Sequence, residues 1–369
     1  FGLQQLFSSS GPEFYFCTLL IGELSILIVL SKLSDGSGRL PIHLFWLSPI
    51  TVIPTYVYGF NDIIPAAFLL VTILAIKISY WKISGCLLAF AVSAKLSMLV
   101  ALPIIILYFI NKASIRHALF KLTASFFVSL SVLSLPFLVS PAALYFLLQN
   151  PELAKLWDYS VSLGDVELVL PPLTYTLFLY WVWRTRRTSF EMLLSFLGVV
   201  FLSLALLTPQ APGWLVWGLP FLVIYQTKSS RITVPLVQVF SVFFVLSVLV
   251  SKPIVFFDGS VFVLNDLIPA FDLPETVVNQ LEAVIANSIG TLVFTIGALL
   301  GIRMWRESIS QNSFFRLSRR PFMISVAGDS GAGKDTFANA LIGAFGEHSA
   351  MNLSGDDYHK YDRNKSMWQ

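Results

Sequence analysis

Charged residues are scarce in this sequence. Asp, Glu, Lys and Arg make up 12% of its 369 residues, whereas soluble domains contain about 25%. The net charge is only +3, and the basic residues are spread over short loops without a stripe of interleaved aromatic side chains. This composition is not that of an ordinary soluble domain, and we expect no nucleic acid as a partner.

Cysteine is scarce as well. Cys17 and Cys86 both lie in apolar stretches, with neither paired spacing nor a histidine cluster beside them. We interpret them as small apolar side chains, and we expect neither a disulfide framework nor a cysteine metal site. A signal peptide is also missing from the sequence, because no basic segment precedes an apolar one at its start.

Long apolar stretches are what the sequence has in abundance. Hydrophobic residues make up 56% of the chain, and stretches near the roughly 20 residues that a membrane-spanning helix needs recur through residues 1–306. We predict a mainly α-helical, polytopic transmembrane bundle of about nine spans plus a re-entrant hairpin. The predicted spans are residues 14–30, 44–58, 63–80, 120–139, 170–183, 192–207, 214–225, 234–250 and 289–304, and the hairpin is residues 83–110.

Lysine and arginine in short loops predict the orientation, because such loops stay in the cytoplasm. The basic loop residues are Lys32, Arg39, Lys77, Lys82, Lys112, Arg116, Lys121, Arg184, Arg186, Arg187, Lys228, Arg231, Arg303 and Arg306. They fall on one side only if the stretch 83–110 enters and leaves on that side. We therefore predict a hairpin of two halves, each reaching about 21 Å, with Lys95 near its tip. Since residues 1–13 are then outside, we also expect a further helix before Phe1.

A glycine-rich loop occurs near the end of the chain. Residues 322–327 are apolar and predict a strand, and residues 337–341 predict a helix. Between them lie Gly328, Ser330, Gly331, Ala332, Gly333, Lys334, Asp335 and Thr336. In a phosphate-binding loop, backbone N–H groups and a helix N-terminus surround phosphate oxygens, and the lysine reaches the β- and γ-phosphates. We expect ATP here; the alternative is a glycine-rich turn that binds nothing.

The residue after Lys334 departs from the usual pattern of such loops. A serine or threonine usually follows the lysine and holds Mg²⁺, but here Asp335 follows and Thr336 comes next. Carboxylate oxygens are also good ligands for Mg²⁺. We therefore expect Mg²⁺, with Asp335 or Thr336 as its ligand.

Residues 351–353 predict a second strand, and a Gly-Asp-x-x-His-x-x-x-Arg run follows it. The run consists of Gly355, Asp356, His359 and Arg363. It resembles the run after the second strand in the phosphoribulokinase and uridine kinase family of P-loop kinases. The resemblance implies that Lys334 and Asp356 are catalytic, Asp356 as general base or orienter of the acceptor hydroxyl, and that His359 and Arg363 bind the acceptor sugar or its phosphate. The alternative is a solvated, charged turn.

Scattered motifs in the apolar part carry a second resemblance. They are Leu47-Ser48-Pro49-Ile50, residues 57–65, Ser84-Gly85, Ala94-Lys95, residues 208–214 and Leu219-Pro220-Phe221. Together they resemble the multi-spanning, polyprenyl-phosphate-sugar-dependent glycosyltransferases of the GT-C type. The resemblance implies a lipid-linked sugar donor and a catalytic carboxylate in the first outer loop, most of which we expect to precede this sequence.

Polar residues at the outer helix ends predict a substrate-binding site on the outer face. Asp62 and Gln210 lie there in the predicted topology, and Lys95 lies inside the membrane near the same level. An ionisable group at this depth is costly and is a functional candidate by default. We expect Lys95 to pair with a lipid-linked phosphate and Asp62 to orient an acceptor hydroxyl. Alternatively, Lys95 reaches the interface or a carbonyl, Asp62 caps a helix, and Glu23 pairs with an unidentified partner.

These patterns predict three segments and a two-part enzyme. The segments are a transmembrane glycosyltransferase-like domain at residues 1–306, a basic cytosolic linker at residues 307–320 and the first part of an incomplete α/β P-loop kinase domain at residues 321–369. The predicted enzyme joins a cytosolic ATP-dependent kinase of a sugar phosphate or nucleoside to a membrane glycosyltransferase, in the plasma (inner) membrane of a prokaryote. The alternatives are a transporter with an ATP-binding appendage, which would tend to show paired broken helices, and a membrane scaffold with a degenerate kinase.

Overall fold

The computed structural model divides the chain into two compact units, Phe1–Arg316 and Leu317–Gln369. The described residues are 12–34, 38–138, 140, 156–185, 188–208, 211–229, 232–251, 254–255, 261–262, 275–312, 323–329, 331–346 and 350–353. Five predicted site residues lie outside them: Gln210, Ser330, Asp356, His359 and Arg363.

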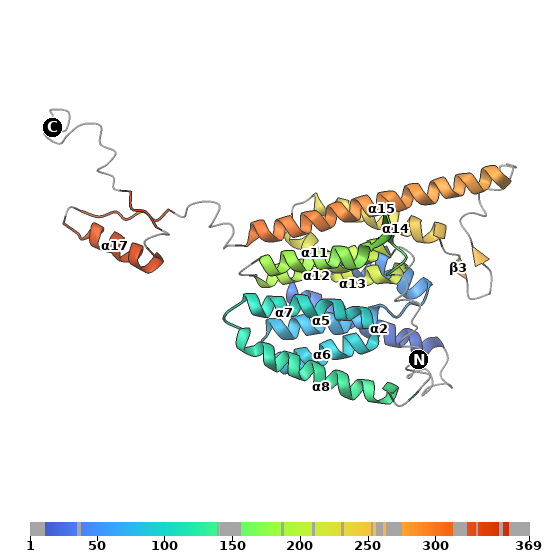
Figure 1. The fold of residues 1–369 in the computed structure, drawn as a ribbon, viewed down its shortest axis with the longest axis horizontal. Helices are drawn as coiled ribbons and strands as arrows, with labels where there is room; N and C mark the ends of the chain where they lie inside the picture. Colours follow the sequence, from blue (N-terminus) through green and yellow to red (C-terminus); the bar gives the residue numbers. More distant parts are fainter. Residues whose placement is uncertain are drawn as a thin grey trace. The chain divides into compact units, whose positions relative to one another are not determined.

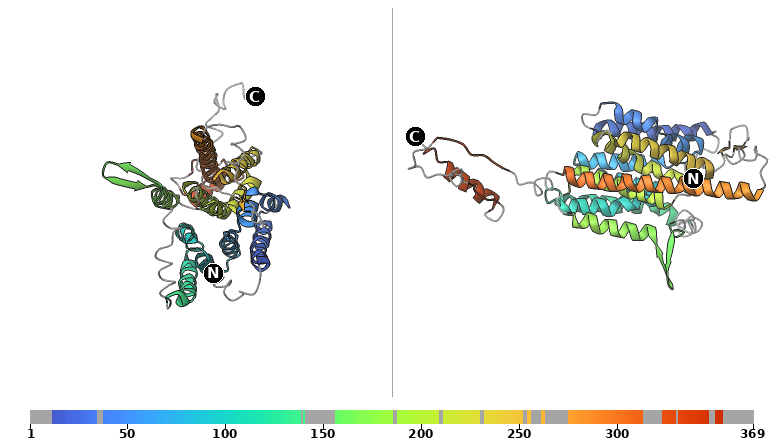
Figure 2. Two further views of the ribbon diagram at one scale, coloured as in Figure 1. Left: turned by 90° about the vertical axis from the view of Figure 1, so that its right-hand side faces the viewer. Right: turned by 90° about the horizontal axis from the view of Figure 1, so that it is seen from above.

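The first unit is built almost entirely of helices, which run in a common direction (Figures 1 and 2). Its longer helices are α2 (Pro12–Leu33), α5 (Ile63–Lys77), α6 (Trp81–Ala94), α7 (Ala101–Asn111), α8 (Leu119–Leu138), α11 (Leu170–Arg184), α12 (Phe190–Leu207), α13 (Leu215–Lys228), α14 (Thr233–Ser251) and α15 (Glu275–Gln311). Its short helical segments are α3 (Leu40–Trp46), α4 (Pro49–Val52), η1 (Ile53–Val57), η2 (Leu96–Val100), η3 (Arg116–Ala118) and η4 (Pro212–Trp214). The prediction of a mainly helical membrane protein is confirmed.

Two small antiparallel hairpins complete this unit. Strands β1 (Ser160–Leu163) and β2 (Val166–Val169) form one, and β3 (Ile254–Val255) and β4 (Val261–Phe262) form the other. The turn between β1 and β2 is Gly164-Asp165, and Gly164 has φ +64°. A positive φ at the first turn position is typical of the tight turns that match strand twist, and glycine adopts it without strain.

Several of the described helices are long and apolar enough to span a membrane. Five helices are long enough and apolar enough to cross a membrane, namely Phe14–Leu33, Arg116–Phe137, Phe190–Leu207, Thr233–Val250 and Gln280–Ser310. A bent pair formed by α3 and Pro49–Val57 would be a sixth span if the pair crosses as one. The other predicted spans coincide with shorter helices, such as α5 with 15 residues, which is about 22 Å long. The predicted total of about nine spans therefore stays a prediction.

Helices α6 and α7 have the arrangement of the predicted hairpin. Helix α6 follows α5 after a short loop and ends where α5 begins, because Lys95, the residue after α6, contacts Asp62, the residue before α5. Lys95 has extended backbone (φ −154°, ψ 118°), which breaks the helix. At the end of α7, Asn111 Nδ2 donates to the carbonyl oxygens of Val182 (3.3 Å) and Thr185 (3.1 Å) at the end of α11. The chain thus turns back at Lys95, as predicted.

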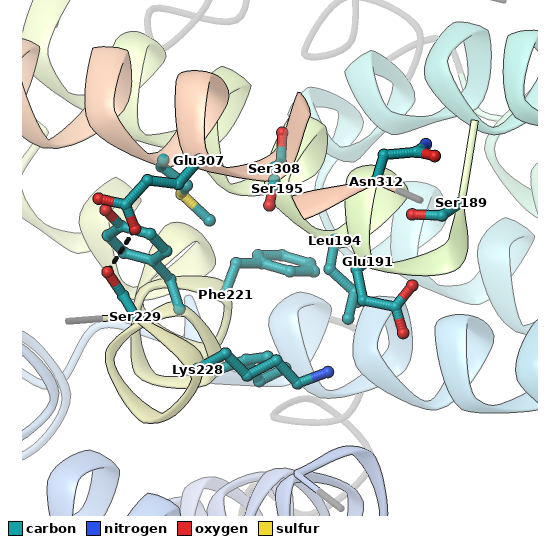
Figure 3. Close-up of a pocket in the computed structure, with 13 residues that line it drawn as sticks. Ser189, Glu191, Leu194, Ser195, Phe221, Lys228, Ser229, Glu307, Ser308 and Asn312 are labelled. Atoms are coloured by element: carbon teal, nitrogen blue, oxygen red, sulfur yellow. Dashed lines mark hydrogen bonds between the residues drawn. The ribbon is translucent and has the colours of Figure 1, made fainter. Parts of the chain in front are cut away.

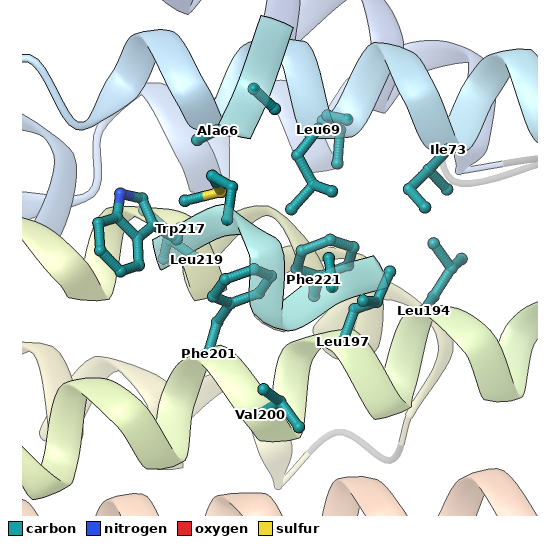
Figure 4. Packing of buried hydrophobic residues seen from close by; sticks show 14 of the residues in the cluster. Ala66, Leu69, Ile73, Leu194, Leu197, Val200, Phe201, Trp217, Leu219 and Phe221 are labelled. Carbon is teal, nitrogen blue, oxygen red and sulfur yellow. The ribbon is translucent and has the colours of Figure 1, made fainter. Parts of the chain in front are cut away.

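Helices α5, α12 and α13 enclose a continuous apolar core (Figure 4). Leu69, Phe201 and Phe221 are buried there, and the two phenylalanine rings stack with centroids 6.3 Å apart. Helix association in lipid depends on van der Waals packing and on small residues that let backbones approach. Gly218 of α13 is such a residue, since a Cβ there would lie 3.4 Å from the backbone nitrogen of Leu202 in α12. This packing fixes the helix ends that carry the polar residues described below.

The second unit contains helix α17 (Lys334–Phe345) after an extended segment and a glycine loop. Neither residues 323–327 nor residues 351–353 form a strand. Both predicted strands are therefore wrong for the described residues, because a strand needs a hydrogen-bonded neighbour and the described part of this unit supplies none. The helix begins at Lys334, earlier than the predicted start at residue 337.

Candidate functional site

Asp62 and Lys95 form an ion pair at the end of the bundle that is predicted from the loop charges to lie outside. Lys95 Nζ lies 2.5 Å from Oδ1 of Asp62, and Asp62 is 3% exposed. The two residues meet because α5 and α6 are antiparallel neighbours, one starting where the other ends. Removing a charged group from water costs free energy. In a buried ion pair, the attraction between two charges in direct contact offsets this cost. The structure therefore joins two of the predicted substrate-binding residues in one cluster.

The geometry also shows which contacts these two residues make within the protein. Lys95 pairs with a carboxylate, although a backbone carbonyl or the membrane interface was an alternative. Asp62 occupies the N-cap position of α5, but its side chain makes no capping hydrogen bond, so capping does not explain it. Gln210, the third predicted residue of this group, lies outside the described residues.

Two tryptophans from α13 and η4 form an aromatic wall beside the ion pair. Lys95 Nζ lies 5.1 Å from the ring centroid of Trp217, within the range of a cation–π contact. The ring of Trp217 stacks on that of Trp214, with centroids 5.0 Å apart, and both residues are buried. Gly213 lies against the carboxylate, since a Cβ there would be 2.0 Å from Oδ2 of Asp62. A larger residue here would have to displace the carboxylate. Gly213 and Trp214 belong to the motif at residues 208–214, but the sequence alone did not indicate any of the three as a site residue.

The turn before Asp62 is held in place by aromatic residues. Tyr15 of α2 donates from its hydroxyl to the carbonyl oxygen of Gly59 at 2.6 Å, and Gly59 has φ +66°. The rings of Tyr58 and Phe60 stack with centroids 5.8 Å apart. These contacts fix the backbone immediately before Asp62 and so fix the direction of its carboxylate.

A second carboxylate, Glu23, is buried in the middle of α2. It is 1% exposed and accepts a hydrogen bond from the hydroxyl of Tyr56. Tyr56 belongs to η1, a π-helical turn, and such turns occur frequently at functional sites. The neighbour of Glu23 in the chain, Gly22, packs on Ile63 at the start of α5, its Cβ position 3.5 Å from Cγ2. Tyr56 is thus the partner of Glu23 that sequence reasoning left unidentified.

A cavity of about 250 Å³ lies at the opposite ends of α12, α13 and α15 (Figure 3). Its apolar side includes Phe221, and its polar side carries Glu191, Lys228 and Glu307. Ser229 donates to the carboxylate of Glu307, which also pairs with Arg303 at 3.2 Å. No sequence pattern indicated this cavity, because charged residues at the ends of apolar helices are ordinary. The arrangement can hold a small polar molecule or headgroup.

The glycine loop of the second unit folds back on Lys334. Lys334 Nζ donates to the carbonyl oxygens of Gly328 and Asp329, each at 2.7 Å. Gly331 and Gly333 have φ values of +82° and +77°, and Gly333 precedes α17 as its N-cap. Lys334, the first residue of α17, is therefore bound to the backbone of the loop that precedes it.

The predicted magnesium ligands lie at the start of α17. Asp335 and Thr336 are both exposed in the first turn of the helix. Among the described residues there is no group of three or more His, Cys, Asp or Glu that could hold a metal ion. A Mg²⁺ ion at Asp335 would therefore need phosphate oxygens and water to complete its shell, which is its usual manner of binding in nucleotide sites.

Comparison with known proteins supports the reading of the membrane part. A family model described as ALG3 protein matches residues 40–163. That family is one of GT-C type membrane glycosyltransferases that use a lipid-linked sugar. The match includes Asp62, Lys95 and the α6–α7 hairpin, and it ends before Trp217 and before the glycine loop. No curated protein and no solved structure matches the chain.

Proposed function

We propose that the membrane part is a glycosyltransferase that takes a sugar from a polyprenyl-phosphate carrier at the outer face of the membrane. The observation that carries the proposal is the ion pair of the buried Asp62 with the half-buried Lys95, both of which lie within the match to the glycosyltransferase family. A carboxylate and an ammonium group at one helix junction supply both kinds of charge that this transfer needs.

Lys95 acts on the leaving group. The bond between the anomeric carbon and the phosphate oxygen breaks, its electron pair stays on that oxygen, and polyprenyl phosphate departs with one more negative charge. A fixed ammonium group stabilises charge that develops in the transition state. The donor phosphate competes with Asp62 for Lys95, so donor binding loosens the ion pair.

Asp62 acts on the acceptor. A new bond forms between the acceptor oxygen and the anomeric carbon, and the hydroxyl proton passes to a carboxylate. Asp62, once its pairing with Lys95 is loosened, can orient that hydroxyl and accept the proton. Trp217 is buried against Lys95, and its ring helps to hold the ammonium group in place.

Transfer from polyprenyl-phosphate sugars by the full chain in lipid nanodiscs tests this function. We expect Lys95→Gln to lower turnover by about 10²–10³, the usual cost of one lost transition-state donor. Lys82→Gln, at an exposed lysine near the start of α6, is the matched control and should leave turnover unchanged. Wild-type turnover by Lys95→Gln, or no transfer from any lipid-linked sugar by the parent, would contradict the proposal.

We further propose that residues 321–369 begin a P-loop kinase that binds ATP and Mg²⁺ and faces the cytosol of a prokaryote. The observation that favours it is the glycine loop with Lys334 held across it. Lys334 would exchange its two carbonyl partners for the β- and γ-phosphates, since a phosphate oxygen carries more charge than a carbonyl oxygen. Asp356 would orient the acceptor hydroxyl of a sugar phosphate or nucleoside, with His359 and Arg363 binding that acceptor.

Nucleotide titration of the full chain, and kinase kinetics on a protein that carries the whole predicted kinase domain, test this second function. Lys334→Ala should abolish ATP binding, whereas Asp356→Asn should keep ATP bound and lower turnover by about 10²–10⁴. Lys360→Ala is the control beside Asp356. Unchanged ATP affinity in Lys334→Ala would refute the P-loop assignment, and ATP binding without turnover on any acceptor would favour a scaffold or transporter.

A further inference from the structure

The hairpin of β1 and β2 has two chemically different faces. Its register pairs Val161 with Leu168 and Leu163 with Val166, and directly paired residues point to the same face of a sheet. These four residues therefore form one face, which we call the apolar hairpin face. The opposite face carries Ser160, Ser162 and Glu167, with Val169 at its end next to α11, and Ser160 Oγ donates to Glu167 Oε2 at 3.3 Å.

The apolar hairpin face is uncovered by the described residues. Leu163 and Val166 are 61% and 60% exposed, and the other two are 48% and 36% exposed. Trp157 and Tyr159, just before β1, are exposed as well. Apolar surface left in water costs about 25 cal/mol per Å², and contiguous patches of it mark contact sites. A contact partner with an apolar surface is therefore expected here.

The position of the hairpin indicates which partner this is. Figure 2 shows the hairpin projecting sideways from the bundle, across the direction of the helix axes. Strand β2 runs directly into α11, and Leu170 N donates to the carbonyl oxygen of Tyr159 at 2.9 Å. Leu173 and Leu177 on the first turns of α11 are also exposed. In a membrane bundle such a helix surface faces lipid, so the apolar hairpin face continues a lipid-facing surface.

We propose that the apolar hairpin face lies on the outer leaflet of the bilayer, with Ser160, Ser162 and Glu167 toward water. A segment that crosses the helix direction at the end of a span lies parallel to the membrane plane, where one face meets lipid and the other meets water. Trp157 and Tyr159 fit this depth, because tryptophan and tyrosine are enriched at membrane interfaces. The proposal does not depend on the transferase function.

The hairpin is also coupled to the candidate site through α11. Tyr175 of α11 donates from its hydroxyl to the carbonyl oxygen of Val100 at 2.9 Å. Val100 ends η2, the segment that begins directly after Lys95. A hairpin bound to the leaflet would therefore keep the start of α11 in place against η2, the segment that follows Lys95.

Face-selective fluorescence quenching tests the proposal. In the full chain with Cys17→Ser and Cys86→Ser, we would place a nitrobenzoxadiazole label at Leu163→Cys or at Ser162→Cys, neighbours on opposite faces. In nanodiscs, nitroxide-labelled phospholipids should remove most of the emission at position 163 and little at position 162. Aqueous iodide should give the reverse order, and emission at position 163 should be shifted to the blue.

A second pair on β2, Val166→Cys and Glu167→Cys, repeats the comparison in case one strand does not tolerate its label. Equal lipid quenching on the two faces, or none on the apolar hairpin face in either pair, would overturn the proposal. Blue-shifted emission without lipid quenching would show a protein partner instead, such as a second copy of this chain, and would overturn it too.

Discussion

At the residue scale, the ion pair of Asp62 and Lys95 predicts strongly coupled stability effects. Lys95→Gln leaves the carboxylate of a residue that is 3% exposed without its cation, and Asp62→Asn leaves the ammonium without its anion. Removing one partner of a buried pair costs about 3–5 kcal/mol. We expect the double variant to be less destabilised than the sum of the two single variants, with a coupling of about 0.5–3 kcal/mol.

Thermal unfolding of the four proteins in one detergent measures this coupling. Turnover is measured on the same variants as stability. A double variant that is stable but has no transferase activity would separate the chemical role of the pair from its structural role. Strict additivity of the two single effects would show that the contact between Asp62 and Lys95 contributes nothing to stability.

The site residues that sequence reasoning found have one property in common. Asp62, Lys95 and Glu23 are ionisable groups within or beside apolar stretches. Burying an ionisable group in lipid costs free energy, so such a residue in an apolar stretch is rare and can be recognised from the sequence. Gly213 and Trp217 have no such signal. A glycine near a proline reads as a turn and a tryptophan in an apolar stretch reads as packing, so their roles beside the ion pair follow only from the contacts.

At the element scale, the contact between α6 and α8 depends on Gly85. A Cβ at this position would lie 2.0 Å from Ser125 Oγ and 2.2 Å from the carbonyl oxygen of Leu122. A backbone atom cannot move aside as a side chain can, so Gly85→Ala must push the two helices apart. We expect a loss of about 1–3 kcal/mol in the free energy of unfolding, typical of overpacking.

Gly290→Ala in α15 is the matched control for this prediction. It is also a helical glycine, but a Cβ there would meet nothing within 4 Å. We expect it to be neutral or slightly stabilising, because alanine has the higher helix propensity. Equal losses of thermal stability in the two variants would show that helix propensity, not the close approach of α6 to α8, decides the effect.

At the scale of the whole molecule, the topology predicts on which side each loop lies. Asp165 at the tip of the β1–β2 hairpin should be outside, and Lys82 near the start of α6 should be inside; both are exposed. In the background Cys17→Ser, Cys86→Ser, an impermeant maleimide should label Asp165→Cys in intact cells and Lys82→Cys only after permeabilisation. Labelling of both in intact cells would overturn the topology.

The sequence by itself determined the class of the protein, a mainly helical membrane protein, and the positions of most of its helices. Apolar length and the positions of lysine and arginine are local properties, so the predicted spans fall on helical segments, although residues 44–58 are broken by a bend, and the turn at Lys95 was expected. Among the described residues of the second unit, the two predicted strands were wrong, because a strand depends on a neighbour, which local composition cannot supply.

Only the tertiary structure decided which residues share a site. Asp62 and Lys95 are brought to one point by the antiparallel packing of α5 and α6, and Trp217 joins them from a helix far along the chain. The partner of Glu23 and the cavity beside Glu307 likewise depend on side chains from different helices. The distances between side chains on different helices depend on how the helices pack. That packing cannot be derived from local sequence patterns.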